Sequence, residues 1–449
     1  MSFKIRIGYT DKTCRRKLYY PHDSHLLLCA PAGSGKGVSV IVPALFEYEG
    51  SCVCIDPKGE NAAVCAAELM RRGVNVFQIN PYNILPEALC RIPSIGYNPY
   101  VTLDPRSLGF GSDCDSLAEA ICYRETGENA SYFTDSARQA IFGVTMQIAK
   151  SAPPGKRDLV TAYELFSGPS FYEFARMACT TGDLQVRGRL GRFTGPKAEE
   201  SRELSGIVNT ARTALGFMGN TAMMQSLKGS DPPLRFADLR QRRTVVFLIL
   251  PTKYLQTSSK WFRLVIASAM SNLLAEERGP FPVLALLDEF AQLGALRVMS
   301  DIIGIGRGYG LKLFPILQDL NQLRELYPER WETFLANSGA QIFFAPRDIT
   351  TAEYVSKRCG ITQVERRNKS FNQTLMGSED QVWTLGGGIS IGLETRPLYH
   401  PHEIAELPGS EMFVFGENIP GVIRAGRKPY WLMPECRSKA SPNPYHRKG

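Results

Sequence analysis

Residues 25–37 read HLLLCAPAGSGKG, an apolar run followed by a turn with three glycines, and a second apolar segment begins at Val38. Strand, glycine-rich turn and helix in this order present backbone N–H groups and a helix N-terminus to a phosphate. Lys36 is placed to reach the terminal phosphate oxygens. The sequence therefore predicts a phosphate-binding loop made of Ala32, Gly33, Ser34, Gly35, Lys36, Gly37 and Val38.

The loop departs from the general P-loop pattern at two positions. Ala30 stands in place of the first glycine, and Gly37 stands in place of the serine or threonine that binds Mg²⁺. Because a glycine-rich turn can also be only a turn, a second element is needed. Residues 282–289 supply one, an apolar strand that ends in Asp288 and Glu289. We expect Asp288 to position Mg²⁺ through water and Glu289 to activate the attacking water; a solvated acidic turn is the alternative.

Two more polar residues are candidates for contact with a γ-phosphate. Gln318 follows the apolar run 311–317, and in a parallel sheet it would lie at the same edge as Lys36. Arg307 lies between two glycines, and we expect it to reach the nucleotide of a neighbouring subunit as an arginine finger. The structural alternatives are a polar strand end and a surface arginine.

Strand and helix patterns alternate on both sides of a long helical stretch. Apolar strands are expected at 25–31, 51–55, 74–79, 244–250, 283–287, 311–317, 341–345 and 412–415. The predicted fold class is α/β, a RecA-like P-loop nucleotide-binding domain with a mainly parallel sheet, interrupted by an all-α domain. The predicted domains are 1–100 and 241–430 for the two parts of the nucleotide-binding domain, 101–240 for the helical insertion, and 431–449 for a polar, basic tail with little core potential. Residues 361–395 are expected to form an extended hairpin or a mobile loop.

The composition is that of an ordinary folded protein. Of 449 residues, 44% are hydrophobic and 21% charged, and the net charge of +8 permits an anionic partner without requiring one. Eleven scattered cysteines without a C-x-x-C pair disfavour a zinc ribbon or a disulfide framework, and those in apolar runs are expected to pack as small hydrophobes. No apolar stretch reaches the ~20 residues of a membrane span, so a soluble, cytoplasmic protein is expected.

Together, these motifs resemble those of the coupling-protein ATPases of type IV secretion and conjugation systems, from about residue 20 to 425. The similar segments are APAGSGKGVSVIVPALF at 30–46, DPKGE at 56–60, LLDEFAQLG at 286–294, GRGYGLKLFPILQDLNQL at 306–323 and RPLYHPHEIAELP at 396–408. In that family a glycine after the catalytic lysine is usual, which accounts for Gly37. Residues 132–138 and 204–211 resemble the family's helical domain, which is thought to meet substrate and relaxosome proteins.

The resemblance implies an ATPase that uses ATP and Mg²⁺ to recruit and pump DNA, single- or double-stranded, or relaxase and effector proteins, to a secretion channel. It implies a hexameric ring, or a monomer when isolated, recruited to inner-membrane secretion components at the cytoplasmic face. Family members generally begin with transmembrane helices, so either an anchor is encoded elsewhere or this is a naturally soluble form. The start methionine and the strand pattern at residues 3–7 favour the soluble form. Two alternatives stay open: an adaptor that uses ATP only for assembly, and a chromosome-type double-stranded DNA translocase.

Other charged residues have both a functional and a structural interpretation. Asp56 follows the strand expected beside the P-loop strand and could support Mg²⁺ through water, and Lys58 could contact phosphate; a Pro-Gly turn with exposed charges explains both equally well. Two basic clusters are expected to be solvated surface rather than contacts to the DNA backbone; they are Arg15, Arg16 and Lys17, and Arg366, Arg367 and Lys369.

Overall fold

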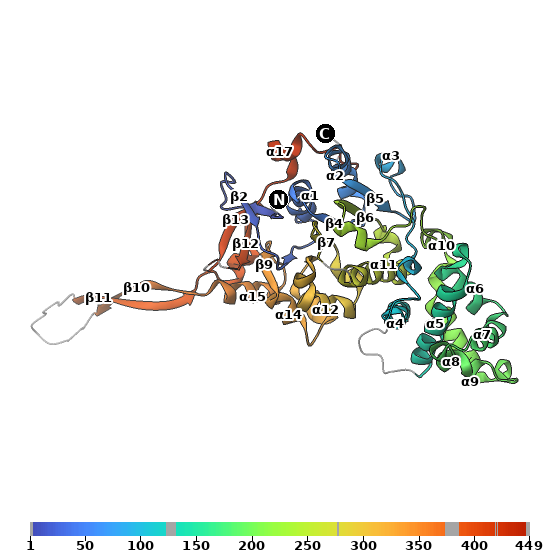
Figure 1. Cartoon of the computed structure of the whole chain (residues 1–449). Coiled ribbons are helices and arrows are strands. Elements are labelled where there is room, and N and C mark those ends of the chain that lie inside the picture. The colour runs from blue at the N-terminus through green and yellow to red at the C-terminus, as the bar shows by residue number, and fades with distance from the viewer. Residues whose placement is uncertain are drawn as a thin grey trace, which may run out of the picture.

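The computed structural model describes residues 3–122, 132–275, 278–372, 386–417, 419 and 421–445. Figure 1 shows a central sheet with helices around it, a group of helices on one side, and a long hairpin that projects on the opposite side. The predicted α/β class with a mainly parallel sheet is confirmed. Across the described residues, no helix combines the length and the apolar character needed to cross a bilayer.

The described residues form a central sheet of eleven strands in the order β2-β1-β13-β12-β9-β3-β8-β7-β4-β6-β5. From β9 to β5 the neighbouring strands are parallel, and β12, β13, β1 and β2 extend the sheet with antiparallel pairs. The strand that precedes the glycine-rich turn, β3, therefore lies inside the sheet. The bounds are β1 Ile5–Tyr9, β2 Lys17–Tyr20, β3 His25–Cys29, β4 Ser51–Ile55, β5 Asn75–Ile79, β6 Thr244–Leu248, β7 Val283–Leu287, β8 Leu311–Leu317, β9 Ser338–Phe343, β12 Glu411–Gly416 and β13 Ile423–Gly426.

Both faces of the sheet are buried. Side chains alternate along a strand, so Leu26 and Leu28 of β3 enter the core formed with α1 and α2, whereas Leu27 and Cys29 enter the core formed with α11 on the other face. Burial on both faces is the reason for the continuous apolar runs in the sequence. The predicted packing of cysteines as small hydrophobes is confirmed for Cys29, Cys52, Cys54 and Cys65, which are at most 2% exposed.

The helices fall into two groups in sequence. Those outside the insertion are α1 Val42–Glu47, α2 Glu60–Arg71, α3 Pro86–Leu89, α11 Leu255–Ala275, α12 Arg297–Ile305, α13 Leu320–Leu326, α14 Trp331–Ala336, α15 Ile349–Cys359, α16 Pro401–Ala405 and α17 Pro434–Arg437. Those between β5 and β6 are α4 Phe110–Ile121, α5 Tyr132–Ser151, α6 Leu159–Ser167, α7 Phe171–Thr180, α8 Leu184–Leu190, α9 Arg202–Ala214 and α10 Thr221–Ser226. In the second group α5 packs against α4, α8 and α9, and no strand lies among the described residues between β5 and β6.

The projecting hairpin consists of β10 Ile361–Asn372 and β11 Gly386–Pro397, which pair antiparallel from Ile361 opposite Pro397. The prediction of an extended hairpin is confirmed for these strands, and residues 373–385 lie outside the described residues. Arg366 and Arg367 are exposed and lie 3.4 Å from Glu394 and 3.9 Å from Glu365. They form a solvated charged surface, as expected; the side chain of Lys369, the third residue of that expected cluster, lies outside the description.

Two strands, β2 and β13, were not predicted, and two expectations need correction. Lys17 is not part of a solvated cluster, because its ammonium lies 2.9 Å from Glu47 and 3.1 Å from Glu435, whereas Arg15 and Arg16 are exposed. The segment after residue 431 is not only a polar tail. Met433 and Cys436 are 1% exposed, because they lie three positions apart on a helical turn that packs into the core around α1 and α2.

Candidate functional site

The glycine-rich turn after β3 is open to an anion. Gly33 and Gly35 have φ values of +73° and +84°, a conformation that suits glycine. The backbone N–H groups of Gly33, Gly35 and Lys36 donate to no acceptor within the described part of the chain. The Ser34 hydroxyl oxygen is also buried without a hydrogen-bond partner there. Unused donors at a helix N-terminus are the groups that hold phosphate.

The helix after the turn begins with one π-helical turn, Gly37–Ile41, which continues directly into α1. Such turns are rare and are frequent at functional sites. The hydroxyl of Ser39 donates to the Gly35 carbonyl at 2.7 Å, so it holds the turn instead of facing a metal. Ala32 is exposed at one end of the predicted loop, and Val38 is half-buried at the other.

Four of the predicted site residues meet at the carboxyl ends of neighbouring parallel strands. The Lys36 ammonium lies 2.9 Å from Asp288 Oδ1 and 2.6 Å from Glu289 Oε1, both of which follow β7. Gln318, which follows β8, donates through Nε2 to Glu289 Oε2 at 3.2 Å. The pairing of β3 with β8 and of β8 with β7 puts these ends side by side. We call Lys36, Asp288, Glu289 and Gln318 the lysine–carboxylate cluster.

The backbone and the charges of this cluster are both unusual. Glu289 has φ 53° and ψ 44°, a left-handed conformation that is uncommon for non-glycine residues and that clusters at functional sites. Burial opposes a charge on Lys36, but the two carboxylates outweigh it and raise the pKa of Lys36. Burial also raises the pKa of Asp288, against the pull of Lys36. One cation facing two carboxylates leaves excess negative charge, and oxygen ligands with this charge suit Mg²⁺.

Arg307 is not part of this cluster. It is exposed in the turn Gly306–Tyr309 that precedes β8, whereas Lys36 follows the end of β3. Because β3 and β8 are parallel, the seven residues of β8 separate the two sheet edges by about 20 Å. A Cβ added to Gly306 would lie 3.3 Å from the ring of His25, the first residue of β3, which also places the turn at the far edge.

Asp56 and Lys58 differ in exposure. Lys58 is an exposed charge in the turn, as the structural alternative expected, whereas Asp56 is buried, so an exposed turn does not describe it. Asp56 is 1% exposed, and its carboxylate accepts hydrogen bonds from the Ala62 N–H at 2.8 Å and the Asn61 side chain at 3.3 Å, so it holds the start of α2. Burial raises the pKa of Asp56 to about 7. Lys58 is exposed, and its ammonium lies 5.9 Å from the ring of Tyr445. Within the described residues neither side chain contacts the lysine–carboxylate cluster.

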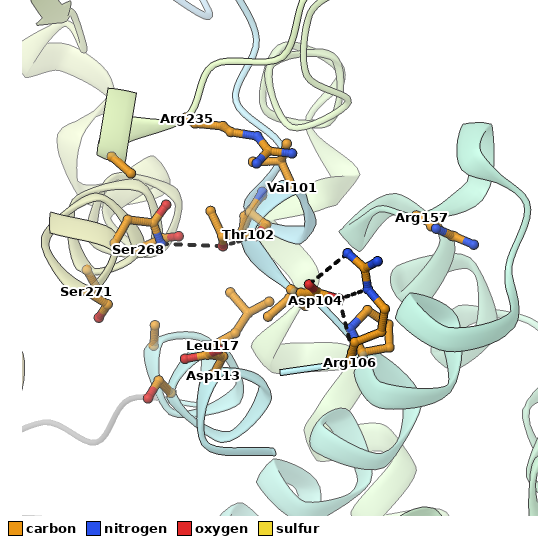
Figure 2. A pocket seen from close by; sticks show the side chains of 18 residues that line it. Val101, Thr102, Asp104, Arg106, Asp113, Leu117, Arg157, Arg235, Ser268 and Ser271 are labelled. Atoms are coloured by element: carbon orange, nitrogen blue, oxygen red, sulfur yellow. Dashed lines mark hydrogen bonds and ion pairs between the residues drawn. The ribbon is translucent and has the colours of Figure 1, made fainter. Parts of the chain in front are cut away.

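A separate cavity of about 640 Å³ lies between the helical insertion and α11. Figure 2 shows the ion pair of Asp104 with Arg106 on one side of it and Ser268 and Ser271 of α11 on another. None of the lysine–carboxylate cluster or the glycine-rich turn lines this cavity. We therefore take the carboxyl end of β3, β7 and β8 as the candidate site.

Sequence reasoning missed one residue at the turn. Arg427, which follows β13, donates a hydrogen bond to the Ser34 carbonyl at 2.6 Å. A single arginine after a short strand has no local pattern that distinguishes it from a surface residue. Only the strand order of the whole sheet brings it to the turn.

The inner position of β3, the open glycine-rich turn and the lysine–carboxylate cluster are the features of a RecA-like P-loop protein, here with a helical insertion between β5 and β6. A comparison with known families agrees with this class. The family model described as type IV secretory system conjugative DNA transfer matches residues 5–448, and the chain belongs to this family.

Individual relatives support the same assignment. Protein VirD4 of Rhizobium rhizogenes is 26% identical over 434 residues, which cover 94% of this chain and 61% of VirD4. The bacterial conjugative coupling protein TrwBdeltaN70, in its unbound form, has a TM-score of 0.67 at 17% identity, covering 94% of this chain and 88% of that chain. The plasmid coupling protein TrwB in complex with ADP and Mg²⁺ has a TM-score of 0.64 at 17% identity, covering 91% and 87%. The chain thus spans about three fifths of the length of VirD4.

Proposed function

We propose that this protein is an ATP-driven coupling protein that recruits DNA, with or without bound relaxase or effector protein, and pumps it to a type IV secretion channel during conjugation. The observation that carries the proposal is the lysine–carboxylate cluster beside an open phosphate loop, in a chain of the conjugative DNA transfer family. Solved structures of TrwB, which has the same fold, are described in complex with ADP and Mg²⁺ and with a non-hydrolysable ATP analogue, which supports ATP and Mg²⁺ as ligands here.

The residues fit these ligands. In the proposed mechanism the free N–H groups of Gly33, Gly35 and Lys36 bind phosphate oxygens, and the Lys36 ammonium exchanges its carboxylate partners for phosphate. Asp288 would hold Mg²⁺ by way of water, and Gly37 offers no hydroxyl to the ion. When bound, Mg²⁺ supplies positive charge that neutralises the phosphates.

Release of Lys36 also changes the other members of the cluster. Glu289 loses its cation and becomes available to accept a proton from the attacking water. Gln318 is hydrogen-bonded to Glu289 and follows β8 directly, so it is placed to report the state of the γ-phosphate to the sheet.

Arg307 has a role only between subunits in this proposal. Its position about 20 Å away, at the opposite edge of its own sheet, prevents it from completing its own pocket. We propose that it completes the pocket of a neighbour in a homo-oligomeric, hexameric ring. The remaining proposed partners are relaxosome or effector proteins and inner-membrane secretion components, with recruitment of the ring to the cytoplasmic face of that membrane.

The test is steady-state ATP hydrolysis with and without single- and double-stranded DNA, at two salt concentrations, with the oligomeric state recorded. We expect DNA to stimulate a rate that Lys36→Ala abolishes and that Lys12→Ala, a change at an exposed lysine, leaves intact. Higher salt should weaken the stimulation, because contacts to the DNA backbone are electrostatic. No hydrolysis at any protein concentration, with or without DNA, would refute the motor and favour the adaptor alternative.

A further inference from the structure

The phosphate loop is held from outside by a residue near the other end of the chain. Arg427 is 8% exposed, and its Nη1 donates to the Ser34 carbonyl at 2.6 Å. Its guanidinium lies 3.9 Å from the centre of the Phe344 ring, and its Nε donates to the Glu411 carbonyl at 3.3 Å. Arg427 therefore joins the loop after β3 to the residues that follow β9 and begin β12.

The charge of Arg427 is not neutralised by the protein. No carboxylate in the described part of the chain forms an ion pair with it, and burial lowers the pKa of Arg427 to about 10. Two other buried cations differ in this respect: Lys36 faces two carboxylates of the cluster, and Arg6 lies 2.8 Å from both Glu47 and Glu435. A buried cation without an anion is costly and calls for a negatively charged partner.

Arg427 also has hydrogen-bonding capacity to spare. A guanidinium carries five N–H donors, and the bonds to Ser34 and Glu411 use two of them. The others meet no acceptor among the described residues, and the guanidinium is not one of the groups that are sealed from solvent without a partner. A Cβ added to Gly35 would lie 3.5 Å from Nη1, so the spare donors are beside the turn whose own N–H groups are free.

We propose that Arg427 is a nucleotide-binding residue of its own chain: it positions the phosphate loop through Ser34, and its spare N–H groups bind the phosphates of the nucleotide held there. This inference rests on the proposed function, because it requires nucleotide at the loop. The proposal makes the residue that directly follows β13 part of the nucleotide pocket. It also distinguishes Arg427, which acts within the chain, from Arg307, which lies at the far edge of the sheet.

The experiment measures the affinity for ADP with Mg²⁺ by titration calorimetry, and the melting temperature with and without ADP. A charge-assisted hydrogen bond lost on Arg427→Gln should weaken ADP binding by about 10- to 100-fold. Arg427→Lys should lose several-fold, because a lysine keeps the charge but cannot reach Ser34 and the nucleotide in one planar fork. Arg424→Gln is the matched control, since Arg424 lies on β13, is 42% exposed and pairs with Glu411; it should bind ADP like the wild type.

The outcomes separate this inference from the proposed function. Suppose that the wild type binds ADP, that Lys36→Ala abolishes this binding, and that Arg427→Gln leaves it intact. The proposed function then stands, and only the inference about Arg427 is overturned. A lower melting temperature without a change in affinity overturns it as well, because Arg427 would then only support the fold. Should the glutamine variant not fold, wild-type affinity in Arg427→Lys overturns the inference and a several-fold loss supports it. If the wild type itself binds no ADP, the proposed function fails and this inference with it.

Discussion

Acidification from pH 7 to pH 5 should destabilise the fold through one residue, His25. This side chain is 2% exposed at the start of β3. Its Nδ1 accepts a hydrogen bond from the Leu313 N–H at 2.9 Å, and its Nε2–H donates to the Ile302 carbonyl at 3.2 Å. Both bonds are possible only for the neutral ring. Burial, aided by the charges of Arg307 and Lys312, lowers the pKa of His25 to about 4.

The sign and size of the effect follow from proton linkage. An unfolded chain, with a histidine pKa of about 6.5, binds a proton at pH 5, whereas the folded chain does not. The stability that His25 contributes is therefore complete above the unfolded pKa and is lost as the pH falls through this range towards about 4. Integration from pH 7 to pH 5 gives a loss of about 2 kcal/mol in the free energy of unfolding, and extension to pH 4 gives about 3 kcal/mol.

Urea unfolding at pH 7 and pH 5 tests this expectation. His25→Gln should be less stable than the wild type at pH 7, but its loss between the two pH values should be about 2 kcal/mol smaller. His402→Gln changes an exposed histidine and should lose as much as the wild type. Equal pH dependence in His25→Gln and the wild type would refute the reasoning. Because the turn with Arg307 packs on His25, amide exchange in this turn should also increase as the pH falls.

Three other substitutions test separate features. Glu289→Gln should lower ATP hydrolysis by roughly 10²- to 10⁴-fold while nucleotide stays bound, as measured by turnover and binding on the same sample; normal turnover would exclude Glu289 as the base. Glu47→Gln removes one of two carboxylates from the buried Arg6 and should cost about 2 kcal/mol in the free energy of unfolding, whereas unchanged stability would show that Glu47 contributes nothing to that site. Asp56→Asn should be more stable than the wild type at pH 8 by up to about 4 kcal/mol. Burial raises the pKa of Asp56 to about 7 in the folded chain, so keeping this carboxylate ionised above its unfolded pKa destabilises the fold, and an asparagine has no charge to bury. The difference should vanish near pH 4, and equal stability at pH 8 would contradict the assigned burial cost.

The parallel part of the sheet was predictable because burial on both faces leaves continuous apolar runs. The predicted bounds 51–55, 283–287 and 311–317 agree with β4, β7 and β8. The strands β2 and β13 were missed because they are only four residues long, too short for a clear apolar pattern.

The position of the lysine–carboxylate cluster was predictable from one rule of sheet topology. Each of its residues comes directly after an apolar strand, or after a glycine-rich turn, and parallel strands bring such positions to one edge. Arg427 obeys no such rule, since it reaches the turn only through the antiparallel extension of the sheet by β12 and β13. The same holds for Cys436, whose burial depends on α17 returning to α2.

The strand order also bears on how the protein is made. β1 can pair with β2 early, but β3 pairs with β8 and β9, and β1 also pairs with β13, so both strands gain these partners only after most of the chain has been synthesised. The helices from α4 to α10 are contiguous and pack largely on one another, so their mutual contacts can form before the sheet is complete. The edge strands and the exposed backbone of β3 would need protection from aggregation during translation. A nascent chain stalled before β13 would contain all the helices from α4 to α10 and an unfinished sheet.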